Sequence, residues 1–114
     1  MLQSPPHQAL QLTAAMQLSE KQKRHLRGLG HSLKPVVMMG NAGLSDGVLA
    51  EVSRALNDHE LIKVRARVGD RKVRDETIAL LCEKSEASLI QRIGNIALVY
   101  RPNPEKQVIA LPRA

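Results

Sequence analysis

The strongest constraint on the fold is the regular alternation in ELIKVRARVG, residues 60–69. Apolar residues occupy every second position there: Ile62, Val64, Ala66 and Val68. The positions between them are cationic: Lys63, Arg65 and Arg67. A period of two predicts a β-strand with one buried face and one cationic outer face. The chain therefore needs a sheet whose inner side is covered by other elements.

Helical signals surround this strand. Ser19 and Gln22 have the spacing of a capping box, which predicts a helix from there to about Gly30. Ser45 is predicted to cap a second helix, and Asp70 a third. The inward positions of the third helix are expected to be Ile78, Leu81 and Cys82.

Further strands are predicted on both sides of these helices. Residues 36–39 form a short continuous apolar run, which is typical of a buried parallel strand. Gly94-Asn95 between two apolar runs predicts a hairpin, and Val108 to Leu111 could add a short edge strand. The order is α-β-α-β-α-β-β, an α/β (α+β) fold with a compact, mixed, four-stranded sheet and three helices. Its two strand–helix–strand units predict parallel neighbours joined by right-handed crossovers.

The residue inventory argues against an enzyme or a metalloprotein. The single cysteine, Cys82, excludes an internal disulfide and a cysteine zinc cluster, and no histidine pair has chelate spacing along a helix. No ordered catalytic partnership is visible, so we expect no catalytic residue, no metal and no cofactor. A free thiol suits a reducing compartment, and we expect a cytoplasmic protein.

The ends and hydropathy of the chain give two further expectations. No segment reaches the length of a membrane span, so no membrane partner is expected. The first 17 residues contain no Lys or Arg, unlike a signal peptide. We interpret residues 1–17 as a flexible N-terminal tail and residues 18–114 as one domain, expected to be a monomer.

The charge balance points to polyanionic partners. The net charge is +6 and the sequence pI is near 10, which favours RNA, DNA or an anionic surface. On the first helix, one face is cationic; it carries Lys21, Arg24, Arg27 and His31. The cationic strand face at Lys63 and Arg65 is either solvated or an extension of a phosphate-binding surface.

The second candidate is the glycine loop, Gly40-Asn41-Ala42-Gly43, between a strand and a helix. A glycine-rich turn before a helix N-terminus presents backbone N–H groups to an anion. The KH module holds nucleic acid with a similar loop, although there it joins two helices. The alternative is a simple tight turn. The loop lacks the Gly-Lys-Ser/Thr ending of a nucleotide-binding P-loop.

Aromatic residues are almost absent, since Tyr100 is the only one. RRM domains stack bases on sheet aromatics, and here only Tyr100 could do so, unless it is a core residue. Binding would rely on phosphates and on the shape of the nucleic acid.

The block LSEKQKRHLRGLGHSLKPVVMMGNAGLSDGVLAEVSRALNDHELIKV and the later IGNIALVYRP resemble bacterial YhbY proteins, single-domain members of the CRM (chloroplast RNA splicing and ribosome maturation) family. The resemblance covers about residues 18 to 112. It implies a fold similar to the C-terminal domain of bacterial translation initiation factor three. It also implies RNA binding and association with large-subunit ribosome precursors. The family's loop corresponds to Gly40, Asn41, Ala42 and Gly43, and its basic helix to Lys21, Lys23, Arg24 and Arg27, followed by Lys34.

We therefore predict a non-enzymatic RNA-binding protein whose partner is ribosomal RNA or a large-subunit precursor. The first helix and the glycine loop are the primary predicted site. The alternative is a protein-interaction adaptor on ribosomal or translation particles whose positive charge is incidental. DNA binding is a weaker third option, because no two adjacent helices are joined by the short turn of a helix-turn-helix.

Overall fold

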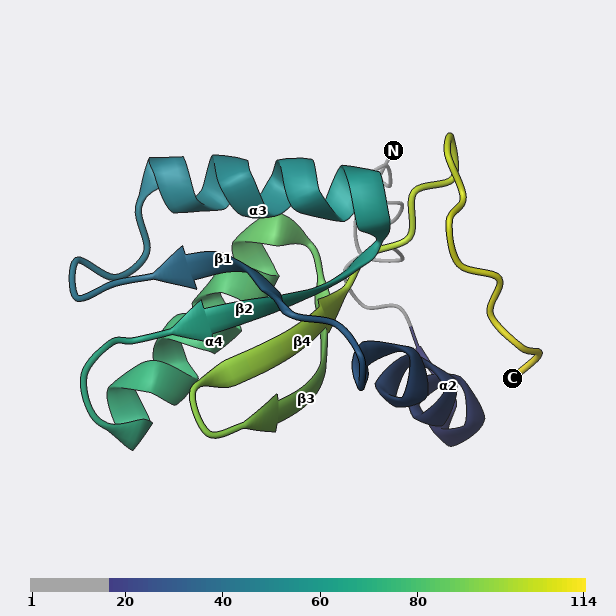
Figure 1. Ribbon diagram of the computed structural model, residues 1–114, viewed down its shortest axis with the longest axis horizontal. Helices are drawn as coiled ribbons and strands as arrows, with labels where there is room; N and C mark the ends of the chain where they lie inside the picture. The colour runs from purple at the N-terminus through teal and green to yellow at the C-terminus, as the bar shows by residue number, and fades with distance from the viewer. Residues whose placement is uncertain (1–16) are drawn as a thin grey trace, which may run out of the picture.

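A computed structural model describes residues 17–114 and shows three helices and one four-stranded sheet (Figure 1). The helices are α2 (Glu20–Gly30), α3 (Asp46–His59) and α4 (Arg71–Ser85). The strands are β1 (Pro35–Met39), β2 (Leu61–Ala66), β3 (Ser88–Ile93) and β4 (Ile96–Tyr100). The predicted element order and the mixed sheet are confirmed. The predicted tail, residues 1–17, lies outside the described residues except for Gln17.

The strand order in the sheet is β1-β2-β4-β3. β1 runs parallel to β2, and β4 runs antiparallel to both β2 and β3. The prediction of two parallel neighbour pairs is therefore only half correct, because β4 is inserted between β2 and β3. This insertion places the most apolar strand of the hairpin at the centre of the sheet, where Ala97 and Val99 are buried.

Each helix begins where its capping residue predicts. The Ser19 side chain accepts from the Gln22 backbone N–H, and the Gln22 side chain accepts from the Ser19 N–H in return. Ser45 and Asp70 each accept a bond from the backbone N–H three residues later. Such caps satisfy N–H groups that have no partner within the helix.

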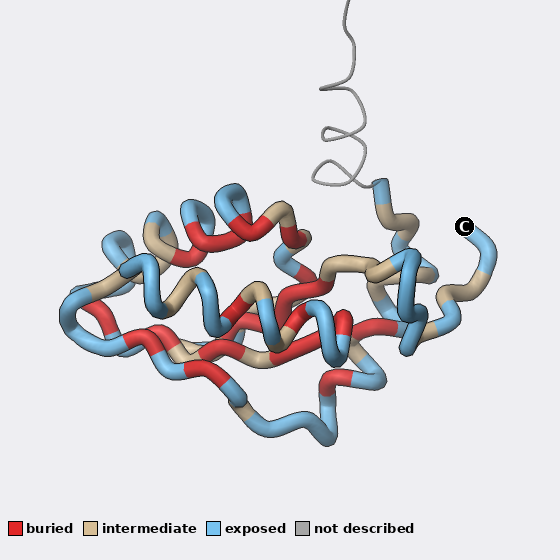
Figure 2. Tube along the Cα trace, turned by 90° about the horizontal axis from the view of Figure 1, so that it is seen from above, coloured by how far each residue is buried: buried red, intermediate tan, exposed pale blue. Residues whose placement is uncertain are grey.

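The core is divided between the two faces of the sheet. One face is covered by α3 and α4, and its apolar cluster includes Met39, Val52, Val64 and Ile78. The other face is only partly covered, by α2 and the C-terminal segment, which we define as residues 102–114; Leu26 is the buried residue that α2 contributes there. In Figure 2 the buried stretches lie along the strands and the inner turns of the helices.

The two neutral titratable side chains in this core are held in their uncharged forms. Burial raises the pKa of the Cys82 thiol to about 11. Burial and then the negative charge of Glu60 raise the pKa of the Tyr100 hydroxyl to about 12. Cys82 is thus the small core residue that the sequence suggested, and Tyr100, which is 2% exposed, is not available to stack on a base.

β1 differs from its prediction as a strand buried on both sides. It is an edge strand, and the side chains of Val36 and Met38 are 50% and 56% exposed. Only Val37 and Met39 point into the core. The reason is that α2 covers the sheet next to β2 and β3 rather than over β1, so one face of the apolar run has no covering element.

The predicted edge strand from Val108 to Leu111 is wrong, because this segment has no regular structure. Its backbone is instead held by the carboxylate of Glu60, which is only 1% exposed. Glu60 accepts from the N–H groups of Val108 (2.8 Å) and Ile109 (2.7 Å), and of Asn103 (2.6 Å). A side chain thus replaces the strand partner that these N–H groups would otherwise require.

Candidate nucleic-acid interface

The exposed face of α2 carries the first group of predicted site residues. Burial of Leu26 fixes the rotation of the helix, and this leaves Lys21 and Arg24 exposed and Arg27 partly exposed. Lys23 forms an ion pair with Glu20 at 3.8 Å. Within residues 17–114, the other three cations of this face have no ion-pair partner. Their charge is therefore available to an external anion.

The glycine loop is an exposed turn between β1 and α3. The N–H of Gly43 donates to the carbonyl of Gly40 at 2.9 Å, and Gly43 has a φ of +77°. That conformation explains glycine at position 43. Glycine at position 40 has no such explanation. Its φ is not positive, and an added Cβ would meet nothing within 4 Å. The turn is confirmed, and a phosphate-binding role for the loop stays a prediction.

The structure does not bring α2 and the glycine loop together. In Figure 1 the loop that follows β1 is at the left-hand end of the long axis, and α2 is at the right-hand end. β1 itself connects the two regions. The basic helix is therefore near the loop in sequence but not in space, and a ligand that contacts both must cross the sheet.

The cationic row on β2, which we define as Lys63, Arg65 and Arg67, crosses that distance. Its side chains lie on the sheet face opposite α3 and α4, and positions two apart on a strand are about 6.6 Å apart. At the end of the row, the N–H of Arg67 donates to the carbonyl of Met39 (2.8 Å), next to the glycine loop. The row thus runs from the side of α2 toward the loop.

The first two cations of this row are partly buried without a compensating charge. Lys63 and Arg65 are both of intermediate exposure, and neither has an ion-pair partner within residues 17–114. Arg65 Nε is buried and has no hydrogen-bond partner among these residues. Partly desolvated cations without an internal anion favour binding of an external one.

The two remaining predicted residues lie between α2 and β1. His31 is the C-cap residue of α2, and its backbone N–H donates to the carbonyl of Gly28 at 3.3 Å. Lys34 directly precedes β1. Both are exposed, and they place additional basic groups at the end of α2 that is closest to the sheet.

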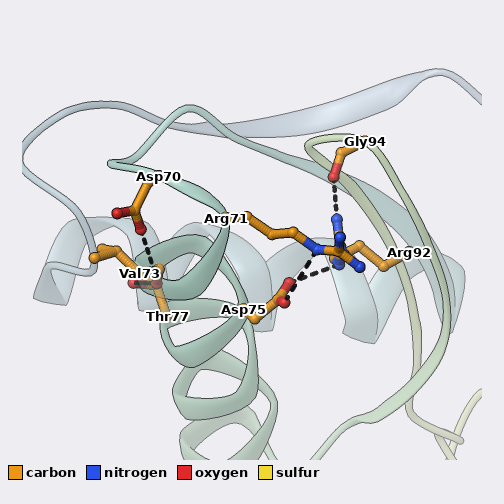
Figure 3. A network of polar contacts seen from close by, with 7 residues as sticks. All are labelled: Asp70, Arg71, Val73, Asp75, Thr77, Arg92 and Gly94. Carbon is orange, nitrogen blue, oxygen red and sulfur yellow. Dashed lines mark hydrogen bonds and ion pairs between the residues drawn. The ribbon is translucent and has the colours of Figure 1, made fainter.

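Two charged residues of α4, Arg71 and Asp75, are paired within the protein (Figure 3). The carboxylate of Asp75 forms ion pairs with Arg92 at 2.7 Å and with Arg71 at 4.0 Å, and Arg92 also donates to the carbonyl of Gly94. Asp70 is occupied as the helix cap. These contacts pin the β3–β4 hairpin to α4, and they neutralise cations that the sequence alone would count as available.

Sequence reasoning missed the apolar part of the open sheet face. Met38 and Ile93, which are 56% and 68% exposed, lie on the same face as Lys63 and Arg65. In the sequence, the runs that contain them look like ordinary core strands. Only the strand order and the position of α2 show that this part of the sheet has no cover.

Residues 17–114 contain neither a candidate metal cluster nor a candidate membrane span. No group of three His, Cys, Asp or Glu side chains in this range could hold a metal ion. No helix in the same range is long and apolar enough to cross a membrane.

A family model and several known proteins match this chain, and the named activity of these proteins is the same. Residues 18–101 match the family model described as the CRS1/YhbY (CRM) domain. A Pseudomonas aeruginosa protein named as a probable RNA-binding protein is 49% identical over 90 residues, 79% of this chain and 86% of that protein. An RNA-binding protein of Haemophilus influenzae is 49% identical over 96 residues, 84% of this chain and 96% of that one.

A solved structure also matches. The solution structure of a hypothetical protein of Staphylococcus aureus, described as a candidate RNA-binding protein, has a TM-score of 0.73 to this structure and 32% sequence identity. The match covers 84% of this chain and 100% of that one. The similarity therefore extends to the whole arrangement of helices and strands.

Proposed function

The chain belongs to the CRS1/YhbY (CRM) domain family, and from this premise we propose that it is a non-enzymatic RNA-binding protein. Its partner is ribosomal RNA, and it acts as a monomer in the cytoplasm during assembly of the large ribosomal subunit. The observation that carries RNA binding is the set of cations without internal partners on α2 and β2. The names of the relatives support the same activity.

RNA would contact the protein along a path rather than at one patch. The exposed face of α2 binds phosphates at one end, the cationic row continues across the sheet, and the glycine loop receives a phosphate at the other end. The buried position of Tyr100 supports recognition through the backbone and shape of the RNA. Crosslinking in cells, followed by sequencing of the attached RNA, tests the assignment to ribosomal RNA.

The affinity for RNA is expected to fall steeply with salt. If about four to six phosphates are neutralised, the log–log slope of affinity against salt concentration is on the order of −3 to −5. The measurement is fluorescence anisotropy with a labelled ribosomal RNA fragment over a range of potassium chloride concentrations. An affinity that does not change with salt would rule out this mode of binding.

The glycine loop is tested by Gly43→Asp, which we expect to weaken RNA binding about tenfold or more while the fold is kept. A Cβ at position 43 would meet no atom within 4 Å, aspartate is among the residues that best tolerate a positive φ, and its charge repels phosphate. The matched control is Gly94→Asp, because Gly94 also has a positive φ and open space around it. If the two variants bind RNA equally well, the loop is not a contact site.

A second candidate function is favoured by an apolar groove of about 410 Å³ between α2, β1 and the C-terminal segment. Leu29, Val36 and Val108 line it, and all three are large side chains with 40% exposure or more. Exposed apolar grooves of this kind mark protein interaction sites. An adaptor that docks on ribosomal particles through this groove would keep its association with them after losing RNA binding.

A further inference from the structure

We infer that a hollow on the open sheet face binds a single unpaired nucleotide of the RNA. The hollow has a volume of about 190 Å³, lies at the end of α2 where His31 is the cap, and includes no residue of the glycine loop. It is lined by His31, Lys63, Gln91, Ile93, Ile96 and Leu98. The inference rests on the proposed RNA binding and adds to it the class of RNA that is preferred.

Strand register places these residues in two adjacent rows. Lys63, Leu98 and Gln91 lie opposite one another across β2, β4 and β3. The next row, toward the glycine loop, contains Arg65, Ile96 and Ile93. The floor of the hollow is therefore apolar in the centre, with Lys63 on the β2 side and the amide of Gln91 on the β3 side. Arg65 lies beside the hollow and outside its lining.

The end of α2 forms the wall of the hollow. Gly30 packs directly on Leu98, since a Cβ at position 30 would lie 2.6 Å from the Leu98 Cδ2 atom. This close approach allows the helix to end over the sheet, so that His31 stands beside Lys63 and Gln91. A side chain at position 30 would therefore force the Leu98 side chain or the end of α2 to shift.

The chemistry of the lining fits each part of a nucleotide. The exposed Ile93 and the partly exposed Ile96 offer an aliphatic surface to the face of a base. Gln91 supplies both a donor and an acceptor, and His31 a further polar group, for the edge of the base. Lys63 supplies the cation for the phosphate, and Arg65, two positions further along β2 on the same face, lies next to the hollow. The side chains of His31, Lys63 and Gln91 make no hydrogen bond with any residue in the range 17–114, so these groups are available to a ligand.

The occupant is an unpaired nucleotide rather than a duplex or a protein segment. In a duplex the base edges are already hydrogen-bonded and its faces are stacked, so neither can enter the hollow. A neutral peptide would fill the apolar floor but leave Lys63 and Arg65 without an anion. A nucleotide satisfies the apolar, polar and cationic parts of the lining together.

The test compares two RNA hairpins that differ only in one bulged nucleotide, with affinities measured by anisotropy at one fixed salt concentration. We expect the protein to bind the bulged hairpin about tenfold more tightly, which corresponds to burial of roughly 55 Å² of apolar surface. Gln91→Leu, which keeps the size and removes the hydrogen-bonding groups, should reduce that preference severalfold without changing the affinity for the fully paired hairpin. Gln17→Leu, an exposed glutamine outside the hollow, should keep the full preference.

The possible outcomes distinguish a failure of the nucleotide-binding inference from a failure of the proposed RNA binding. Equal affinity for both hairpins overturns the inference but leaves RNA binding intact. If Gln91→Leu keeps the full preference for the bulged hairpin, the inference is also overturned, because the bulged nucleotide then binds at another site. Failure to bind either hairpin overturns the proposed function itself. Amide shifts of Lys63, Gln91 and Ile93 specific to the bulged hairpin would support the inference.

Discussion

Replacing Glu60 by alanine is expected to lower the free energy of unfolding by about 3–5 kcal/mol, a large share of the stability of a domain of this size. The substitution removes a buried carboxylate that accepts from the backbone N–H groups of Asn103, Val108 and Ile109. Bonds to an ionised acceptor stabilise more than neutral ones, and the donors would be left without their partner. Urea unfolding followed by circular dichroism measures the loss.

Two companion variants separate the carboxylate from the backbone conformation of Glu60. Its φ is +65°, so Glu60→Gly relieves the strain of a left-handed conformation and should be about 1 kcal/mol more stable than Glu60→Ala. Glu60→Gln keeps an acceptor for Val108 and Ile109 but turns its NH₂ group toward the N–H of Asn103. Its stability should therefore lie between the alanine variant and the parent.

The same substitution should also release the C-terminal segment. Hydrogen exchange at the amides of Asn103, Val108 and Ile109 is expected to become fast in Glu60→Ala, while exchange in β2 and β4 stays slow. If those three amides remain protected, other contacts hold the segment and the role assigned to Glu60 is wrong. Such contacts would include the bond from the Gln22 side chain to the carbonyl of Pro112.

The parts of the fold that sequence predicts well depend on neighbouring residues. The caps at Ser19 and Asp70 each need only a side-chain oxygen and the backbone N–H three residues later. The hairpin at Gly94 needs only a positive φ, which is +60° in the structure. These interactions form between residues a few positions apart, so their signals are visible in a short stretch of sequence.

The parts that sequence predicts poorly depend on distant residues. The apolar run of β1 has no alternation, so nothing in it shows that Val36 and Met38 would be exposed at an edge. Glu60 resembles an ordinary surface residue between a helix and a strand, and its partners are more than 40 positions away. The pairing of β4 with β2 is a further example, because the residues within each strand do not show which other strand will be its neighbour.

The candidate site shows the same division. Charge pattern identified the cations of α2 and β2, because a face of one sign is visible as periodicity. It could not show that α2 and the glycine loop lie at opposite ends of the molecule (Figure 1). Nor could it show that Arg92 and Arg71 share Asp75 (Figure 3). Arg65, in contrast, has no carboxylate partner within residues 17–114. Whether a cation can bind an external anion therefore depends on which side chains lie next to it in the folded protein.

Reversing three charges on α2, with Lys21, Arg24 and Arg27 all replaced by glutamate, is expected to reduce RNA affinity by about a thousandfold at physiological salt. Three phosphate contacts are lost and three repulsions replace them, and the salt slope should become shallower by about 2 to 3. The side chains are exposed or partly exposed and lack ion-pair partners within residues 17–114, so the helix should still form. Circular dichroism checks the fold, and anisotropy measures the affinity.

The matched control reverses the same number of charges on the other side of the sheet. Arg54 on α3, and Lys72 and Lys84 on α4, are exposed and have no ion-pair partner within residues 17–114. Their replacement by glutamate changes the net charge equally, so it measures the long-range effect of net charge alone. If both triple variants lose affinity to the same extent, RNA responds to the overall charge and α2 is no specific site. If the α2 variant loses RNA binding and still sediments with ribosomal particles, the result favours the adaptor over the RNA-binding protein.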